Sequence, residues 1–204
     1  MTRPALLSRA TLCAALVAVL LVGCAHTPKP HYYVLSGPRE VTHSAVRSGP
    51  TVGPTIGLGP ITLPDYLDRP QIVSRASDSR LALSNEHRWA EPLAASFSRA
   101  LLAHLEQALP TQDIVLHPWR SSLDIARQVQ IEVTRFERGA DGTFRLGARW
   151  SVSAAGSDTD SGTRQNDIEI PLEAKSDDYD ALLAAANSAV AALATTIATQ
   201  LKAP

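Results

Sequence analysis

The spacing of apolar residues predicts a long helix near the middle of the chain. In residues 89–109 a large apolar side chain recurs every four positions from Trp89 to Leu109, and charged residues gather on the opposite side. This pattern is typical of an amphipathic helix that lies on a sheet. Pro92 suits the first helical turn, where its missing N–H is not needed, and Pro110 would end the helix.

A second long helix is predicted at the C-terminus. It begins near Ser176 and carries an apolar stripe from Tyr179 to Leu201. Asp177 and Asp178 would supply cap oxygens and negative charge at its N-terminus. The other face consists mostly of Ala, Thr and Ser with almost no charge. That face is either an ordinary alanine-rich surface or a second contact surface for another chain.

Alternation of apolar and polar residues, rich in β-branched and aromatic types, predicts strands in much of the remaining chain. These strands are expected at residues 31–35, 55–63, 71–75, 81–84, 113–116, 128–136, 144–152 and 167–172. The polar residues 77–80 and Asp141-Gly142 would each close a hairpin, and residues 37–54 and 153–164 are expected as loops. The predicted fold is therefore α+β: an antiparallel or mixed sheet with two long amphipathic helices packed on one face.

The N-terminus has the pattern of a bacterial lipoprotein signal. Arg3 and Arg9 precede an uncharged apolar stretch that is short for a membrane span, and Gly23-Cys24 completes a lipobox. We therefore expect cleavage before Cys24, whose thiol and new amino group would carry N-acyl diacylglycerol with chains such as palmitate. The alternative is a short transmembrane anchor with a chance cysteine. The lack of a basic stop-transfer cluster after Cys24 argues against it.

The whole chain would thus consist of three parts: a signal peptide (1–23) that is removed, a lipidated tether (24–30) and a single domain (31–204). Ala25 follows the lipidated cysteine, whereas an Asp there usually retains Gram-negative lipoproteins in the inner membrane. We therefore expect the protein on the outer membrane, lipid-anchored and facing the periplasm. Cys13 would leave with the signal, so the mature chain could form no internal disulfide.

Charge and motifs exclude several functions. Loss of the signal leaves 17 basic and 20 acidic side chains, without the basic stripe that nucleic acid requires. The sequence contains no HExxH, CxxC, GxSxG or Walker motif, and its six histidines lack the spacing of metal ligands. Gly57-Leu58-Gly59 is followed by Pro60 and so does not resemble a phosphate-binding loop. We predict no catalytic residue, no metal site and no cofactor apart from the lipid on Cys24, and hence a protein that is not an enzyme.

Two runs of sequence are distinctive. The first, which we call the turn run, is residues 63–73 (LPDYLDRPQIV), and the second, the helix-start run, is residues 88–93 (RWAEPL). Together with the lipobox and the early residues 32–35 (YYVL), they make the chain similar to the PqiC/YmbA family. Members of that family are auxiliary lipoproteins of ABC-type, MCE-domain lipid transport systems. The resemblance covers nearly all of the mature chain and implies a PqiC-like ABC-transport auxiliary domain at 31–204.

The resemblance also implies partners. The lipoprotein would dock a periplasm-spanning conduit built by a PqiB-like MCE-domain protein, which works with an inner-membrane partner, and would support envelope integrity. Docking on a ring-shaped partner would favour a ring homo-oligomer. Two alternatives stay open: a periplasmic lipid-binding shuttle, and a structural lipoprotein of another envelope assembly machine. A periplasmic hydrolase would require folding to bring Asp, His and Ser side chains together in a cleft.

The turn run supplies the candidate partner-binding residues. A stiff segment between two prolines that carries an aromatic and an arginine suits a protein contact. The candidates are Pro64, Tyr66, Leu67, Asp68 and Arg69. In the alternative reading Tyr66 and Leu67 plug the sheet edge while Asp68 and Arg69 pair locally. Trp89 of the helix-start run is expected in the core, with an exposed lipid or partner contact as the alternative.

Overall fold

The computed structural model describes residues 29–38, 54–110, 112–154, 162–171 and 178–202. Contacts divide the chain into a unit of residues 1–30 and a unit of residues 31–204. Cys24 and the predicted signal sequence lie outside the described residues. The elements of the second unit are β1 (His31–Tyr33), β2 (Thr55–Thr62), the 3-10 helix η2 (Asp65–Leu67), β3 (Gln71–Ser77), β4 (Arg80–Trp89), α2 (Leu93–Ala108), β5 (Ile114–Leu116), β6 (Ile125–Arg138), β7 (Thr143–Ala154), β8 (Arg164–Pro171) and α3 (Tyr179–Lys202).

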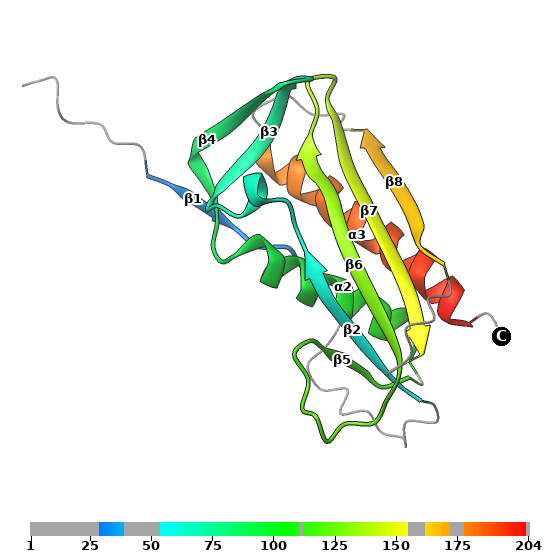
Figure 1. Ribbon diagram of the computed structural model, residues 1–204. Helices are drawn as coiled ribbons and strands as arrows, with labels where there is room; N and C mark the ends of the chain where they lie inside the picture. The colour runs from blue at the N-terminus through cyan, green and yellow to red at the C-terminus, as the bar shows by residue number, and fades with distance from the viewer. Residues whose placement is uncertain (1–28, 39–53, 111, 155–161, 172–177, 203–204) are drawn as a thin grey trace, which may run out of the picture. The chain divides into compact units, whose positions relative to one another are not determined.

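The long strand β6 organises the sheet (Figure 1). One edge of β6 pairs antiparallel with β7, and β7 pairs antiparallel with β8. The other edge pairs in parallel first with β2 and, further along, with β3 at Ser74 and Arg138. β5 continues the sheet beyond β2, and β4 and then β1 continue it beyond β3. The described strands thus form one open mixed sheet, as the sequence predicted.

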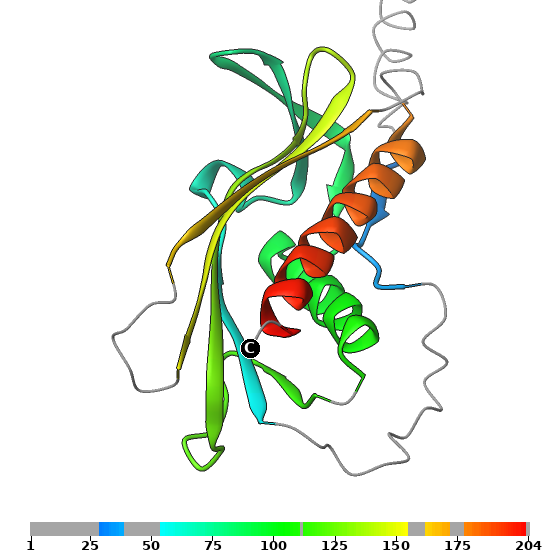
Figure 2. The ribbon, with the colours of Figure 1, turned by 90° about the vertical axis from the view of Figure 1, so that its right-hand side faces the viewer.

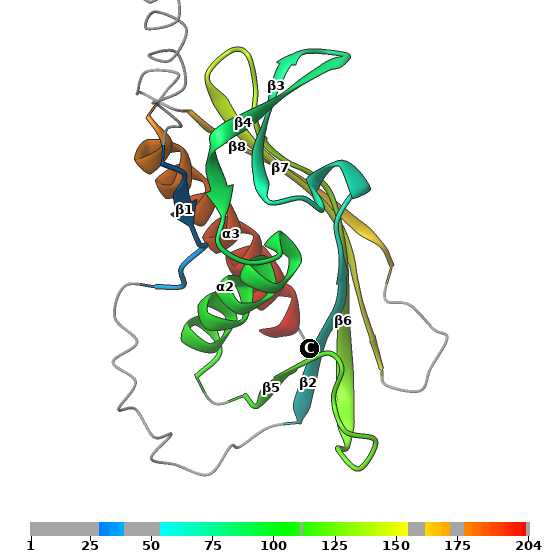
Figure 3. The same ribbon diagram turned by 90° about the vertical axis from the view of Figure 1, so that its left-hand side faces the viewer.

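Both helices cover the same face of this sheet (Figures 2 and 3). Apolar residues of β6 and β7 alternate toward the helices, and Val129, Leu146 and Ala148 have no solvent exposure. On the helices, Phe97 and Leu101 of α2 are fully buried in the same core. The predicted α+β architecture with two helices on one face is confirmed.

The two predicted hairpins are present. Asp78 and Ser79 connect β3 to β4, and residues 139–142 connect β6 to β7. Gly142 has a φ of 75°, a conformation that glycine adopts without strain. The backbone N–H of Gly139 donates to the carbonyl of Thr143 (2.8 Å) and closes the second turn.

The start of the middle helix was predicted wrongly. Trp89 ends strand β4, where its N–H donates to the carbonyl of Pro70 (2.7 Å), and α2 begins only at Leu93. The reason is local: a residue before proline is disfavoured in helical conformation, which places Glu91 outside the helix. Pro92 is the N-terminal cap, with φ −51° and ψ 128°, and not a residue of the first turn.

The C-terminal helix is capped as predicted by Asp178, whose Oδ1 accepts from the N–H of Ala181 (2.9 Å). Ser176 and Asp177 lie outside the described residues, as do most of the two predicted loops. α3 is long and apolar enough to cross a membrane, yet 56% of its most apolar window is buried inside the domain. Such burial is typical of a core helix in a fold like this one.

The alanine-rich face of α3 is partly covered by the chain itself. The backbone N–H of Ser36 donates to Oδ1 of Asn187 (3.1 Å), and the N–H of Leu35 donates to Oγ of Ser96 in α2 (2.9 Å). The segment after β1 therefore lies against both helices. The hydroxyls of the exposed Ser188, Thr195, Thr196 and Thr199 donate to carbonyls one turn earlier in α3. Part of the face left open as a second contact surface is thus an internal contact.

Candidate functional site

The structure brings the turn run and the helix-start run together. The N–H of Trp89 donates to the carbonyl of Pro70, so the end of β4 is held against the end of the turn run. A surface depression of about 300 Å³ lies at this junction. It is lined by Asp68, Arg69, Pro70, Trp89, Ala90, Glu91 and Pro92. Two segments that were distinctive in the sequence therefore form one site.

The turn run is held in a compact conformation by its own backbone. The N–H of Leu67 donates to the carbonyl of Pro64 (2.9 Å), and that of Asp68 donates to the carbonyl of Asp65 (3.1 Å). A third bond joins the N–H of Arg69 to the carbonyl of Leu67 (2.9 Å). Because β2 and β3 both pair with the same edge of β6, this turn spans the gap between them. Its geometry is therefore fixed at both ends.

The five candidate contact residues occupy different environments. Leu67 is 2% exposed and belongs to the core, so it contributes to a surface contact only by holding the turn in place. Tyr66 and Pro64 are partly buried, and Asp68 is exposed. Arg69 is partly buried, and its Nε has no hydrogen-bond partner. In the described part of the chain no ion pair joins Asp68 to Arg69, and the Asp68 side of the turn is open to solvent.

An ion pair with a buried carboxylate lies beside the turn run. Nε of Arg75 in β3 donates to Oε1 of Glu137 in β6, whose side chain is only 1% exposed. Tyr66 lies beside this pair. Its pKa is raised to about 12, first because burial disfavours the phenolate and then because the Glu137 carboxylate repels it. Tyr66, Arg75 and Glu137 therefore connect the turn to the two strands on which it rests.

Sequence reasoning did not single out Glu137. Alternation along β6 places it on the sheet face away from the helices, opposite Arg145 of β7, where a charged residue would normally be solvated. A bulge between Val133 and Arg135 sets this register. The turn run then covers that part of the sheet, which the sequence of β6 alone does not reveal.

Trp89, which lines the site, belongs to an aromatic cluster in the core. Trp89 is 6% exposed and lies 6.5 Å, centroid to centroid, from Phe136. Phe136 in turn meets Phe97 and Phe144 edge to face, at 5.6 and 4.9 Å, a geometry that aromatic rings favour. The expectation that Trp89 is a core residue is confirmed.

The rim of the site carries both signs of charge. Arg99 on the second turn of α2 donates to Oε1 of Glu91, just before that helix. This hydrogen bond to Arg99 lowers the pKa of Glu91. Asp68 and Arg69 also line the depression, which therefore carries both signs of charge beside Trp89, an arrangement that suits a polar protein surface.

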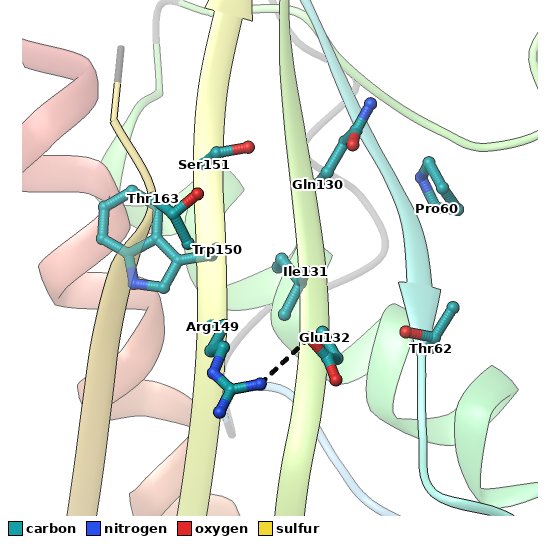
Figure 4. Close-up of a pocket in the computed structure, with 9 residues that line it drawn as sticks. All are labelled: Pro60, Thr62, Gln130, Ile131, Glu132, Arg149, Trp150, Ser151 and Thr163. Carbon is teal, nitrogen blue, oxygen red and sulfur yellow. Dashed lines mark ion pairs between the residues drawn. The ribbon is translucent and has the colours of Figure 1, made fainter. Parts of the chain in front are cut away.

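A second depression, of about 280 Å³, lies across β2, β6 and β7 (Figure 4). Figure 4 shows Arg149 and Glu132 reaching toward each other from neighbouring strands, with Nη1 to Oε2 at 3.7 Å. Pro60 and Thr62 border it on the β2 side. In the ranges that the structure describes, no three His, Cys, Asp or Glu side chains are placed to hold a metal ion.

The glycines of residues 57–59 have a packing role that the sequence did not reveal. A Cβ on Gly57 would lie 2.7 Å from the ring of Trp119, and one on Gly59 would lie 2.8 Å from Cβ of His117. Gly59 also has a φ of 119°. The chain after β5 therefore folds back over β2, and the loop of residues 117–124 is anchored by Trp119 at the end of the domain away from β1 (Figure 1).

Comparison with known proteins identifies the family. Residues 33–198 match the model of the ABC-type transport auxiliary lipoprotein component. The intermembrane transport lipoprotein PqiC of Escherichia coli (strain K12) is 27% identical over 142 residues, which cover 69% of this chain and 73% of PqiC. The PqiC of Shigella flexneri matches to the same extent.

Solved structures share the fold. A crystal structure described only as an uncharacterized protein superposes with a TM-score of 0.70 at 20% identity, covering 86% of this chain and all of the other. Protein XCC0632 from Xanthomonas campestris gives 0.63 at 16% identity, over 87% and 94% of the two chains. The family is one of transport auxiliary lipoproteins and not of enzymes. This chain belongs to the family of ABC-type transport auxiliary lipoprotein components, as the turn run and the helix-start run indicated.

Proposed function

We propose that this lipoprotein is anchored through lipid on Cys24 at the periplasmic face of the outer membrane. There it docks a PqiB-like MCE-domain protein, whose conduit and inner-membrane partner move lipid across the periplasm and support envelope integrity. The family match supports an auxiliary role in a transport system. The relative PqiC, named an intermembrane transport lipoprotein, supports transport between membranes.

The observation that carries the docking role is the junction of the two runs. The turn run is fixed by its own hydrogen bonds, by the buried Leu67 and by the bond from Trp89 to Pro70. A contact surface that is rigid before binding loses little conformational entropy on association. Asp68 and Pro70 are exposed on this rigid turn. The site therefore has the properties of a protein-docking surface.

The size of the depressions favours an adaptor over a lipid-carrying shuttle. The two depressions described above, around Pro70 and Glu132, have volumes of about 300 and 280 Å³. A third, around Tyr179, has a volume of about 360 Å³. These values lie at the lower limit of pockets for drug-sized ligands, about 300 Å³. A two-chain phospholipid is much larger, and all three depressions are open to solvent. None of the three would enclose such a cargo.

The test is a pull-down of the native protein from solubilised membranes, with mass spectrometry of co-purifying proteins and lipids. We expect an MCE-domain protein to co-purify. Asp68→Arg should lower its recovery by at least about tenfold, because a wrong charge at an interface costs several kcal/mol. Gln130→Arg is the control, since it introduces an arginine at an exposed position on the sheet, outside the turn run, and should leave recovery unchanged.

Two results would overturn the proposal. One is unchanged recovery of the MCE-domain protein with Asp68→Arg, which would move docking away from the turn run. The other is recovery of stoichiometric phospholipid without an MCE-domain protein, which would favour a shuttle. Membrane fractionation and the mass of the N-terminal peptide test the anchor separately, by showing which membrane holds the protein and whether Cys24 is acylated.

A further inference from the structure

The outer strand β1 presents apolar side chains to solvent where an edge strand is normally polar. Tyr32 is 61% exposed and Val34 is 50% exposed, whereas Leu35 is 5% exposed. Side chains alternate along an extended chain, so Tyr32 and Val34 share one side and Tyr33 and Leu35 share the other. The inward side faces the helices, because Tyr33 stacks with Tyr179 of α3 at 6.0 Å between centroids. The apolar pair therefore points away from the helices.

β1 is held rigidly in this orientation. The hydroxyl of Tyr33 and Nδ1 of His87 in β4 share a hydrogen bond (2.8 Å). The ring of His87 in turn lies flat on the ring of Tyr179, with 3.6 Å between centroids and 4° between planes. The carbonyl of Tyr33 also accepts from the N–H of Ala90 (2.9 Å). The outward side of β1 is thus a fixed part of the domain.

Positive charge lies beside the apolar pair. Arg88 pairs in register with Tyr32 on the neighbouring strand, so the two side chains share one face of the sheet. Lys29 precedes β1 and is exposed. A tyrosine and an aliphatic residue beside an arginine suit the interface of a membrane, where rings sit at headgroup level and cations meet phosphates.

The short segment between Cys24 and β1 indicates which surface lies against Tyr32 and Val34. Tyr32 is only eight residues beyond Cys24. Fully extended, that segment spans at most about 30 Å. A lipid on Cys24 would therefore keep β1 close to the bilayer surface.

We propose that the β1 outer face, formed by Tyr32, Val34 and Arg88, lies against the phospholipid surface of the membrane that holds the anchor. The contact orients the domain, so that the loop of residues 117–124, toward the opposite end in Figures 1 to 3, points away from the bilayer. This inference rests on the membrane anchor of the proposed function and is independent of the docking partner.

The test uses the lipidated protein with a photo-crosslinking amino acid in place of Tyr32 or, as matched control, Leu123. Leu123 is also exposed (41%) and lies in the distal loop. The protein is reconstituted in vesicles of phosphatidylethanolamine and phosphatidylglycerol, and lipid adducts are measured by mass spectrometry. We expect at least about tenfold more lipid adduct at position 32 than at position 123, since burial of even a few methylene groups favours a contact by that factor.

Lengthening the tether separates contact from mere proximity. A Gly/Ser insertion between Lys29 and Pro30 should leave the adduct at position 32 nearly unchanged, whereas Val34→Ser with Arg88→Ser should lower it several-fold. Loss of the adduct on lengthening, equal adduct at positions 32 and 123, or a crosslinked protein dimer through position 32 would each overturn the inference. Failure of the anchor is recognised separately, by an unacylated Cys24 and absence of the protein from membranes.

Discussion

Removing Arg75 should destabilise the domain strongly, because Glu137 would stay buried without its counter-charge. The Glu137 side chain is 1% exposed and that of Arg75 is 28% exposed. Breaking a buried ion pair by deleting one partner costs about 3–5 kcal/mol. Water reaches Arg75 in part, so we expect Arg75→Met to lower the free energy of unfolding by about 3 kcal/mol, at the low end of this range.

A second substitution tests this reasoning. Adding Glu137→Gln to Arg75→Met removes the unpaired charge. The double variant should therefore have a free energy of unfolding about 2 kcal/mol higher than Arg75→Met alone, even though it carries one more substitution. Urea unfolding of residues 25–204, followed by circular dichroism at neutral pH, gives the free energies. Arg99→Met, which breaks the exposed pair with Glu91, is the control and should cost less than about 1 kcal/mol. A loss for Arg75→Met no greater than the control, or a further loss on adding Glu137→Gln, would refute the argument.

Three further substitutions test other contacts. The pKa of Tyr66 is raised to about 12, so the folded state keeps the phenol proton when the unfolded chain has lost it, and the resulting stability is complete below about pH 10. The free energy of unfolding of the wild type should therefore fall by about 1–2 kcal/mol relative to that of Tyr66→Phe as the pH rises from about 10 toward 12; this range is reduced because Tyr66 is partly exposed. A difference in unfolding free energy between the two proteins that stays constant at all pH values would contradict this. Gly57→Ala places a methyl 2.7 Å from the ring of Trp119 and should cost about 1–3 kcal/mol. Trp119→Leu in the same chain should recover part of that loss, and no recovery would mean that another contact is responsible. Leu67→Ala should lower the free energy of unfolding by about 2–5 kcal/mol through the cavity it leaves in the core; a Tm within error of wild type would show that the turn does not depend on this side chain.

Local signals in the sequence were enough to predict elements but not their partners. The polar residues 77–80 and Asp141-Gly142 act within a few residues, so both hairpins followed from the sequence. The parallel pairing of β2 with β6 joins Ile56 to Arg127, and alternation within either strand says nothing about which strand lies beside it. The helix start was wrong for a local reason, because Pro92 disfavours a helical conformation at Glu91; the bond from Trp89 to Pro70, a residue from another segment, then holds Trp89 in β4.

The candidate site shows the same limit. The turn run and the helix-start run were recognisable, but only the fold shows that they meet at one depression. From the sequence Leu67 was either a contact residue or a plug of the sheet edge, and the structure places it in the core, because neighbouring side chains of a turn can face opposite ways. Glu137 and Trp119 went unnoticed, since their roles depend on the turn run and on Gly57, each far away in the sequence.

The position of β6 at the centre of the sheet has a consequence for how the chain folds. Its local partner is β7, which follows directly, but β2 and β3 were synthesised long before it and pair with its other edge. Sheets that depend on such distant parallel pairs fold slowly, because the intervening chain must first lose much of its freedom. Until residues 125–138 are present, β2 and β3 have exposed edges and no strand between them and the rest of the sheet. The first half of the chain therefore cannot complete its part of the sheet ahead of the second half.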